Sequence, residues 1–160
     1  MNIDRLWAPW RIKYIGAKKR KGCLFCQAGK SNKDFLVFKT KYSLCIMNIF
    51  PYNNGHLMVA PLKHTNDLSK LNEKEALDLF YSLNKAQQLL KQTLKPHGFN
   101  IGINLSAAAG AGITQHLHIH IVPRWCGDSN FMPIVANTKV ISQSLEELHR
   151  ILKKANQRIK

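Results

Sequence analysis

The sequence predicts an α+β domain in which an antiparallel sheet of about five strands packs against two main helices. Short runs of apolar and β-branched residues, separated by polar turns, indicate the strands. Two longer stretches, 66–94 and 142–159, instead repeat apolar residues at helical spacing. The chain has 160 residues, 45% of them hydrophobic, which fits one globular domain. No run approaches the roughly 20 apolar residues that a membrane-spanning helix needs.

The strands are expected in five places. Residues 35–39 and 43–47 predict a short antiparallel pair. After a turn at 51–55, residues 56–61 predict a strand that ends at Pro61, because proline cannot donate to a sheet ladder. The remaining strands are expected at 99–104 and within 115–124.

The two helices are predicted from their apolar periodicity. Asn72 or Ser69 could cap the N-terminal side of the first, and Pro96 to Gly98 closes it. The second is amphipathic, with its lysines outward. Helical spacing relates Leu79, Leu83, Ala86 and Leu90, and also Ala76, Phe80 and Leu94, in the first helix; Leu145, Leu148, Ile151 and Leu152 are expected to point inward from the second.

Residues 1–22 predict an N-terminal arm, and residues 23–160 the folded domain. The arm is basic and aromatic, and Pro9 argues against a strand there. The N-terminus has no apolar region of the kind found in secretory signals. We therefore expect a cytoplasmic protein with no membrane partner, in which a disulfide framework would be out of place.

The formal net charge of +15 indicates an anionic partner. Such a field attracts nucleotides, polyphosphates or nucleic acid. Each basic cluster, such as residues 18–21, is individually better explained as solvated surface. Because no nucleic-acid-binding motif is recognisable, the charge favours a phosphate-bearing small molecule over nucleic acid.

Three histidines, His116, His118 and His120, alternate with apolar residues in the fifth predicted strand. Side chains alternate between the two faces of a strand, so all three imidazoles should share one face. An imidazole has a reference pKa of about 6.5 and can act near neutral pH as nucleophile, acid or metal ligand. We expect a metal site, a catalytic site or both, rather than three structural histidines.

A loop of small residues precedes these histidines. In Ala109 to Gly112 the glycines permit positive φ and close backbone approach, and successive N–H groups could form an anion-binding nest. A plain hairpin loop is the alternative.

Cys23 and Cys26 form a C-x-x-C pair with the spacing of a zinc knuckle. The pair supplies half of a tetrahedral site, and His56, His64 and His116 are available as further ligands. A redox dithiol or an unligated pair of cysteines are the alternatives.

These residues resemble the histidine-triad (HIT) superfamily of nucleotide hydrolases and transferases. The family signature, His-x-His-x-His followed by two apolar residues, is matched at 116–122, and 54–61 is similar to the family's Gly-His strand. Residues 5–11 and 120–131 resemble the bacterial branch of diadenosine tetraphosphate hydrolases and phosphorylases. The resemblance implies a single HIT-like domain and a homodimer.

The resemblance also implies residue roles. His118 matches the nucleophile that forms a nucleotidyl intermediate, His120 a phosphate-binding histidine, and His56 a supporting histidine. Asn48 matches a ribose-binding position and Asn104 an asparagine near the phosphates. The stretch expected to meet the phosphates is Gly110, Ala111, Gly112 and Ile113.

For the metal, the resemblance implies structural zinc on Cys23, Cys26, His64 and His116. One departure is Ile113, which stands where many members carry serine or threonine and cannot donate a side-chain hydrogen bond. This departure disfavours simple phosphoramidase activity.

The function expected is cleavage of a dinucleoside polyphosphate, diadenosine tetraphosphate in the first place, at the α-phosphate through a covalent nucleotidyl-histidine. A phosphoramidase or another adenylate hydrolase, and a non-catalytic nucleotide- or nucleic-acid-binding module, are the alternatives. The residues leave open whether water or inorganic phosphate releases the nucleotide.

Overall fold

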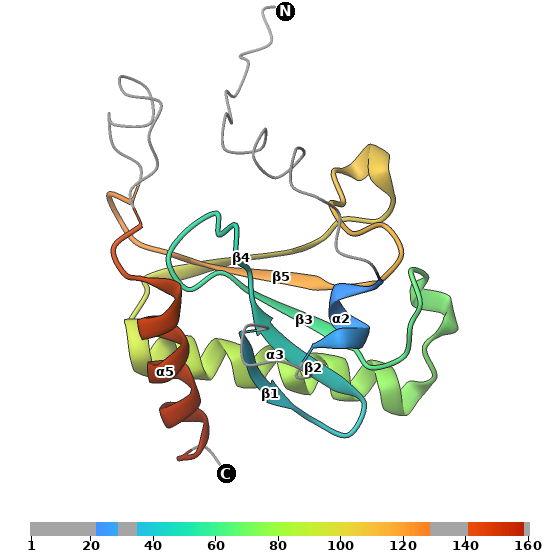
Figure 1. The fold of residues 1–160 in the computed structure, drawn as a ribbon, viewed down its shortest axis with the longest axis horizontal. Coiled ribbons are helices and arrows are strands. Elements are labelled where there is room, and N and C mark those ends of the chain that lie inside the picture. The colour runs from blue at the N-terminus through green and yellow to red at the C-terminus, as the bar shows by residue number, and fades with distance from the viewer. Residues whose placement is uncertain (1–21, 29–34, 129–140, 159–160) are drawn as a thin grey trace, which may run out of the picture.

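The computed structural model describes residues 22–28, 35–128 and 141–158. The predicted arm, apart from Gly22, lies outside these residues. A five-stranded antiparallel sheet forms the centre of the fold, with strand order β1-β2-β3-β5-β4 (Figure 1). The predicted fold class is therefore confirmed. The elements are α2 (Leu24–Gln27), β1 (Leu36–Lys39), β2 (Ser43–Met47), β3 (Leu57–Pro61), the 3₁₀ turn η2 (Leu68–Lys70), α3 (Glu73–Leu94), β4 (Gly98–Ile103), the 3₁₀ turn η3 (Ala107–Ala109), β5 (Ile119–Arg124) and α5 (Leu145–Asn156).

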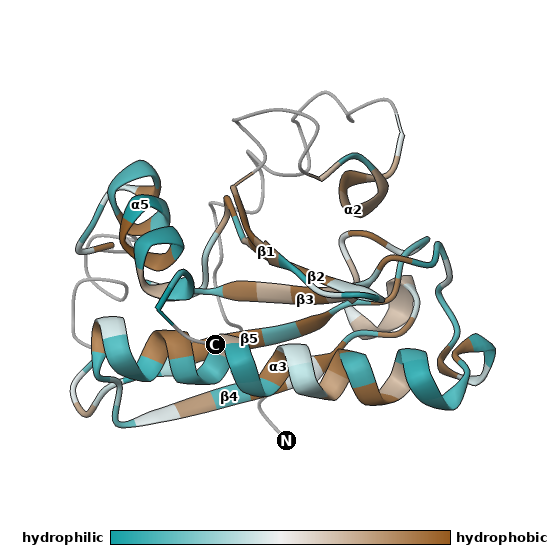
Figure 2. Ribbon diagram, turned by 90° about the horizontal axis from the view of Figure 1, so that it is seen from below, coloured by the Kyte–Doolittle hydropathy of each residue, from teal (hydrophilic) through white to brown (hydrophobic). Residues whose placement is uncertain are grey.

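The sheet is covered on both faces, and the alternation of side chains divides its core into two clusters. The long helix α3 runs along one face, and the short helix α2 sits on the other (Figure 2). In β2, Cys45 and Met47 belong to the larger cluster, together with residues of α3. Leu44 and Ile46 point the other way, into a smaller cluster with Phe25 of α2. This explains why β2 is buried at every position.

The helix α3 begins at Glu73, later than the start of the predicted stretch. Asn72 accepts a hydrogen bond from the Glu75 N–H, and the Glu75 carboxylate accepts one from the Asn72 N–H. This capping box satisfies two N–H groups at the helix start. The turn η2 occupies part of the predicted stretch before it. Leu79, Leu83, Ala86 and Leu90 are buried as expected, whereas Phe80, on the second set of spaced positions, is 65% exposed.

The helix α5 follows Ser144, whose side chain accepts a hydrogen bond from the Glu147 N–H. Leu148 and Leu152 are buried in the larger cluster with α3, and Leu145 packs against its edge. Ile151 is only partly buried. None of the helices in the described ranges combines the length and apolar character needed to cross a membrane.

The fifth strand starts at Ile119, so His116 and His118 precede it instead of lying in it. Met58 pairs with His120 and Val59 with Ile119, which would set Pro61 opposite Leu117. Pro61 has no N–H to donate, and the Leu117 N–H donates to the Thr65 carbonyl at 2.6 Å instead. The alternation still holds through this segment, because Leu117, Ile119 and Ile121 all belong to the cluster under α3. The three histidines consequently project from the opposite face.

Candidate active site

His118 is held in one tautomer by its main-chain contact. The side chain is 3% exposed, and Nδ1 lies 2.8 Å from the His116 carbonyl oxygen. A carbonyl can only accept, so Nδ1 carries the hydrogen and Nε2 of the neutral ring carries a lone pair. Burial lowers the pKa of His118, which favours the neutral form. A neutral imidazole with a free Nε2 lone pair is the state that a nitrogen nucleophile requires.

A chain of hydrogen bonds likewise fixes His56 and His120. The Tyr52 N–H donates to His56 Nδ1 at 3.1 Å, so the hydrogen of the neutral His56 ring is on Nε2. His56 Nε2 then donates to His120 Nδ1 at 2.9 Å. His120 is left with an N–H at Nε2, a donor suited to a phosphate oxygen. Burial, together with the neighbouring His118, lowers the pKa of His120 to about 4.

Asn48 also contacts this chain. Its Nδ2 donates toward His56 Nδ1 at 3.3 Å, and its Oδ1 accepts from the Phe50 N–H at 2.9 Å. The predicted ribose-binding residue thus lies beside the histidines, at the end of β2, and orients the His56 ring as well.

The four predicted metal ligands come together from three separate parts of the chain. One ligand atom from each of Cys23, Cys26, His64 and His116 lies within 4.8 Å of all the others. His116 Nδ1 is 3.2 Å from Cys23 Sγ, 3.7 Å from Cys26 Sγ and 3.3 Å from His64 Nδ1. Cys26 Sγ lies 3.2 Å from His64 Nδ1.

These four separations, from 3.2 to 3.7 Å, are close to those around a single tetrahedral ion. Zinc bonds of about 2.0–2.3 Å require ligand atoms about 3.3–3.8 Å apart. His116 also has the tautomer that a metal ligand requires. Its Nε2 donates to the Pro61 carbonyl at 2.9 Å, which leaves a lone pair on Nδ1. Two thiolates and two imidazoles are a donor set that suits zinc. The residues could therefore hold this ion.

The glycine-rich loop offers fewer phosphate donors than its sequence suggests. Gly110 adopts φ of 86°, and its N–H already donates to the Ala107 carbonyl. The Ala111 N–H donates to the Ser106 carbonyl. The N–H groups of Gly112 and Ile113 are then the candidate donors to an anion. The Ile113 side chain packs against the cluster that contains Phe25.

Asn104 follows β4 directly and is partly buried. Among the residues that the structure describes, no hydrogen bond or ring contact joins Asn104 to the three histidines. Its predicted role near the phosphates stays a prediction.

Sequence reasoning missed three contributors to this site. Tyr52 stacks its ring on His56, with centroids 4.8 Å apart, and supplies the N–H that fixes the His56 tautomer. Phe25 contacts both His116 and His118. The Pro61 carbonyl fixes His116. Phe25 could have been noticed because it stands between the two cysteines, whereas no sequence signal identifies a main-chain donor or acceptor.

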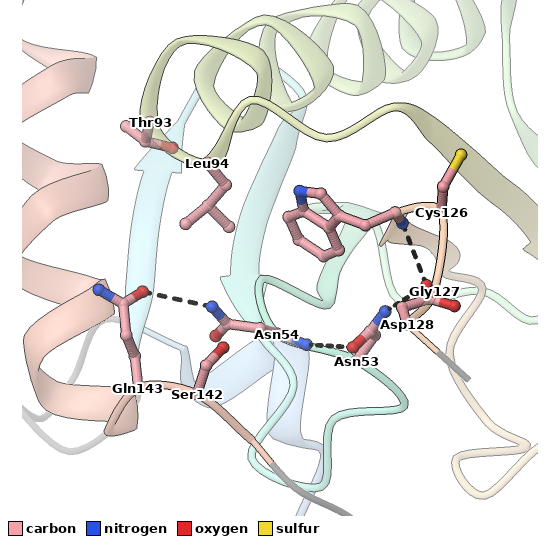
Figure 3. Close-up of a pocket in the computed structure, with 10 residues that line it drawn as sticks. Asn53, Asn54, Thr93, Leu94, Cys126, Gly127, Asp128, Ser142 and Gln143 are labelled. Atoms are coloured by element: carbon pink, nitrogen blue, oxygen red, sulfur yellow. Dashed lines mark hydrogen bonds between the residues drawn. The ribbon is translucent and has the colours of Figure 1, made fainter. Parts of the chain in front are cut away.

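A separate open pocket, drawn in Figure 3, has a volume of about 550 Å³. Asn53 and Asn54 of the turn before β3 line it, with Trp125 and Asp128 after β5 and Gln143 before α5. None of the three alternating histidines, nor any of the four clustered metal ligands, contributes to it. The pocket therefore belongs to neither the histidine cluster nor the metal cluster.

Comparison with known proteins agrees with this architecture. Residues 29–126 match the HIT domain family. The chain belongs to this family. The match includes His56, His64 and the three alternating histidines, but it starts after Cys23 and Cys26. Within the described residues, the geometry of the four side chains makes the cysteine pair candidate metal ligands.

This HIT protein is similar to two relatives and one solved structure in particular. It is 35% identical to the AP-4-A phosphorylase of Mycobacterium tuberculosis, over 94% of this chain and 83% of that protein. It is 36% identical to the asymmetrical bis(5'-nucleosyl)-tetraphosphatase of Schizosaccharomyces pombe, over 54% of this chain and 47% of that protein. A zinc-bound histidine triad family protein from Mycobacterium smegmatis superposes with a TM-score of 0.67 at 26% identity, covering 86% of this chain and 94% of that one.

Proposed function

We propose that this HIT protein is an enzyme that cleaves a dinucleoside polyphosphate, with diadenosine tetraphosphate as the first candidate, at the α-phosphate. The observation that carries the proposal is the tautomer of His118, whose Nδ1 bond to the His116 carbonyl leaves a lone pair on Nε2. The similarity to a protein named AP-4-A phosphorylase supports this substrate class.

The first step forms a bond between His118 Nε2 and the α-phosphorus. The bond from that phosphorus to the bridging oxygen breaks, and the oxygen leaves with the electron pair as part of ATP. A nucleotidyl-histidine remains. Water or inorganic phosphate then attacks the same phosphorus, and the phosphorus–nitrogen electron pair returns to His118. Water yields AMP, whereas phosphate yields ADP.

The neighbouring groups stabilise the charge that develops on the phosphoryl oxygens. His120 Nε2–H and the N–H groups of Gly112 and Ile113 are the donors we assign to this task, and Asn48 and Asn104 to binding the nucleotide. Fixed donors in a water-poor site stabilise such charge more than mobile water does. The N–H groups of Gly112 and Ile113 replace the side-chain donor that Ile113 cannot supply.

We propose zinc as a structural ion bound by Cys23, Cys26, His64 and His116. The separations of the four ligand atoms support this assignment, as does the similarity to a protein named as zinc-bound. When bound, the ion cross-links α2 to the loop after β3 and to the segment before β5. Structural zinc can contribute on the order of 10 kcal/mol to folding.

The test is a product assay on diadenosine tetraphosphate with and without inorganic phosphate. ATP plus AMP indicates hydrolysis, and ATP plus ADP that requires phosphate indicates phosphorolysis. Both outcomes support attack at the α-phosphate. Two molecules of ADP in the absence of phosphate, or no cleavage, would contradict the proposal.

The role of His118 is tested by His118→Ala, with His149→Ala as the matched control. His149 lies in α5 and contacts the Leu36 carbonyl, so it belongs to neither site. We expect His118→Ala to lower kcat by at least about 10³-fold and to form no acid-labile nucleotidyl adduct. Unchanged turnover by this variant would remove His118 from the mechanism.

We also propose that two copies form a homodimer. The exposed apolar residues Leu77, Phe80 and Tyr81 sit at i, i+3 and i+4 on α3. The strand β4 forms an edge of the sheet, where Ile101 is exposed. Sedimentation of Phe80→Glu against the wild-type chain tests this: we expect a dimer that the substitution weakens. A wild-type monomer at micromolar concentration would refute it.

We place the protein in the cytoplasm. Zinc binding by Cys23 and Cys26 requires reduced cysteines, which the cytoplasm maintains. Cell fractionation tests the location, and recovery of the protein outside the cytoplasm would contradict it.

A further inference from the structure

Phe25 lies between the proposed metal ligands and the proposed nucleophile. It stands in α2, between Cys23 and Cys26, and is 2% exposed. Its ring centroid is 5.0 Å from that of His116 and 5.0 Å from that of His118, with interplanar angles of 46° and 34°. One aromatic ring therefore contacts both imidazoles, one in each site.

The helix that carries Phe25 is a single turn and needs an external anchor. It spans only Leu24–Gln27, and the side chain of Cys23 makes no capping hydrogen bond. So short a helix is not stable by itself in water. Its anchors are the two cysteines at the metal cluster and the apolar contacts of Phe25 with the smaller core cluster.

His116 supplies a second connection between the two sites. Its Nδ1 faces the metal cluster, and its Nε2 donates to Pro61. Its main-chain carbonyl accepts the hydrogen bond from His118 Nδ1. The residue that would bind the ion thus also fixes the tautomer of His118.

The Nδ1 hydrogen bond to the His116 carbonyl opposes rotation of the His118 ring about its Cβ–Cγ bond, but the net contribution of one hydrogen bond is modest. A half-turn of the His118 ring about its Cβ–Cγ bond would exchange the positions occupied by ring nitrogen and carbon. The lone pair of Nε2 would then point away from the phosphorus. The Phe25 ring against the His118 ring limits this rotation by contact, and the His120 ring, edge-on with centroids 4.8 Å apart, also packs against His118.

We propose that Phe25 is a positioning residue for His118. The metal-binding turn that contains Phe25, residues 23–27, holds it in place. This inference rests on the proposed function, because it assigns His118 the attacking nitrogen. It predicts that loss of the Phe25 ring alters the orientation of His118 while the metal site remains loaded. If Phe25 acted only as a core residue, its substitution would lower stability and leave His118 as it was.

The experiment uses Phe25→Leu and Phe25→Met in the full chain, with Phe38→Leu as the matched control. Phe38 is also buried but belongs to the larger cluster, on the face of α3. Both substitutions keep a large apolar side chain at this position, so both variants should fold. The readouts are zinc per chain, kcat and KM separately, and the ¹⁵N spectrum of the His118 ring.

We expect both Phe25 variants to keep the wild-type zinc content and a KM within about twofold, while kcat falls about 10- to 100-fold. The ¹⁵N signals of His118 should move toward those of a tautomer mixture, and Phe38→Leu should leave them unchanged. An unaltered His118 spectrum in both Phe25 variants would overturn the inference. The His118 spectrum tests the role of Phe25 even if the wild-type protein cleaves no dinucleoside polyphosphate. Absence of cleavage would count against the proposed function alone.

A second measurement follows the wild-type protein as a chelator removes zinc. We expect the His118 signals to change in step with zinc loss, before the circular dichroism of the fold changes. His118 signals that persist unchanged in the folded, zinc-free protein would show that zinc binding by the metal-binding turn does not hold Phe25 in place. If the fold and the zinc are lost together, the His118 spectra of the Phe25 variants decide whether Phe25 orients His118.

Discussion

His56 Nε2 lies 2.9 Å from His120 Nδ1, and the hydrogen bond between them runs from His56 to His120. The direction follows from the Tyr52 N–H, which donates to His56 Nδ1. Nδ1 of the neutral ring therefore carries no hydrogen, and Nε2 carries it. A main-chain group near the protein surface thereby determines which nitrogen His120 offers to a ligand. In the proposed mechanism His56 acts through the tautomer of His120.

Breaking this connection should reduce the rate of cleavage. In His56→Leu the donor to His120 is lost, so the His120 ring is free to take the tautomer that presents a lone pair to phosphate. We expect kcat/KM to fall by about 10²-fold, the effect of losing one fixed donor. His56→Gln is the comparison, since its side-chain amide can still donate. Equal losses in the two variants would show that the donated hydrogen is not what His56 supplies.

The low pKa of His120 predicts a pH dependence of stability. Its pKa is lowered to about 4 in the folded protein by burial and by His118, against about 6.5 in an unfolded chain. Between these values the unfolded chain binds more protons, so the free energy of unfolding should rise with pH from about 4 to 6.5. Denaturant titrations across this range should show a shallower rise in His120→Gln than in the wild type. A variant with the same slope as the wild type would contradict the burial argument.

Removing one proposed metal ligand should destabilise the fold. Cys26→Ser replaces a thiolate by a hydroxyl, a poor ligand for zinc, and leaves three ligands. We expect zinc content to fall well below one per chain and Tm to drop by at least about 10 °C, since ligation is coupled to folding. Cys126→Ser is the matched control, because Cys126 is exposed and lies outside the four-residue cluster. Equal zinc content in the two variants would argue against the assigned ligand set.

The common face of the three histidines could be predicted because their apolar neighbours alternate with them. Leu117, Ile119 and Ile121 are buried under α3, as a strand-like segment requires. The start of β5 could not be predicted, because it depends on Pro61 of a strand that is far away in sequence. Cross-strand register, not local preference, ends the ladder at Ile119.

The helix α3 likewise has one feature that could be predicted from the sequence and one that could not. Its capping residue Asn72 was one of two predicted candidates, and the Glu75 that completes the box is three residues further on. The burial of its side chains was harder to assign, because two sets of apolar positions share helical spacing. Only the packing against the sheet distinguishes Leu79, which is buried, from Phe80, which is exposed.

The protonation pattern of the site was beyond prediction for another reason. The tautomers of His116, His118 and His56 are fixed by the Pro61 carbonyl, the His116 carbonyl and the Tyr52 N–H. Every residue type except proline carries the same main-chain donor and acceptor, so sequence gives no indication of which ones reach a side chain. The residue types of the site could be predicted, whereas their tautomers depend on which main-chain groups the fold brings to each ring.

Asp128 joins the end of β5 to the turn before β3. Its carboxylate accepts two hydrogen bonds from Arg124, at 2.7 and 2.9 Å, and one from Asn53 at 2.8 Å. The Trp125 N–H adds a fourth at 3.1 Å. The hydrogen bonds from Arg124, the largest cause, lower the pKa of Asp128 to about 2.

Replacing this carboxylate should therefore matter at neutral pH and not in strong acid. A carboxylate with a lowered pKa stabilises the fold above its unfolded pKa of about 4, and the effect is lost as pH falls toward 2. We expect Asp128→Asn to lower the free energy of unfolding by about 1 kcal/mol at pH 7, a modest value because Arg124 is half exposed to solvent. Urea titrations at pH 7 and pH 2.5 should show the difference from the wild type shrinking at the lower pH, with Glu146→Gln as a control. A difference of the same size at both values would mean that hydrogen-bond geometry, and not the charge of Asp128, holds the two turns together.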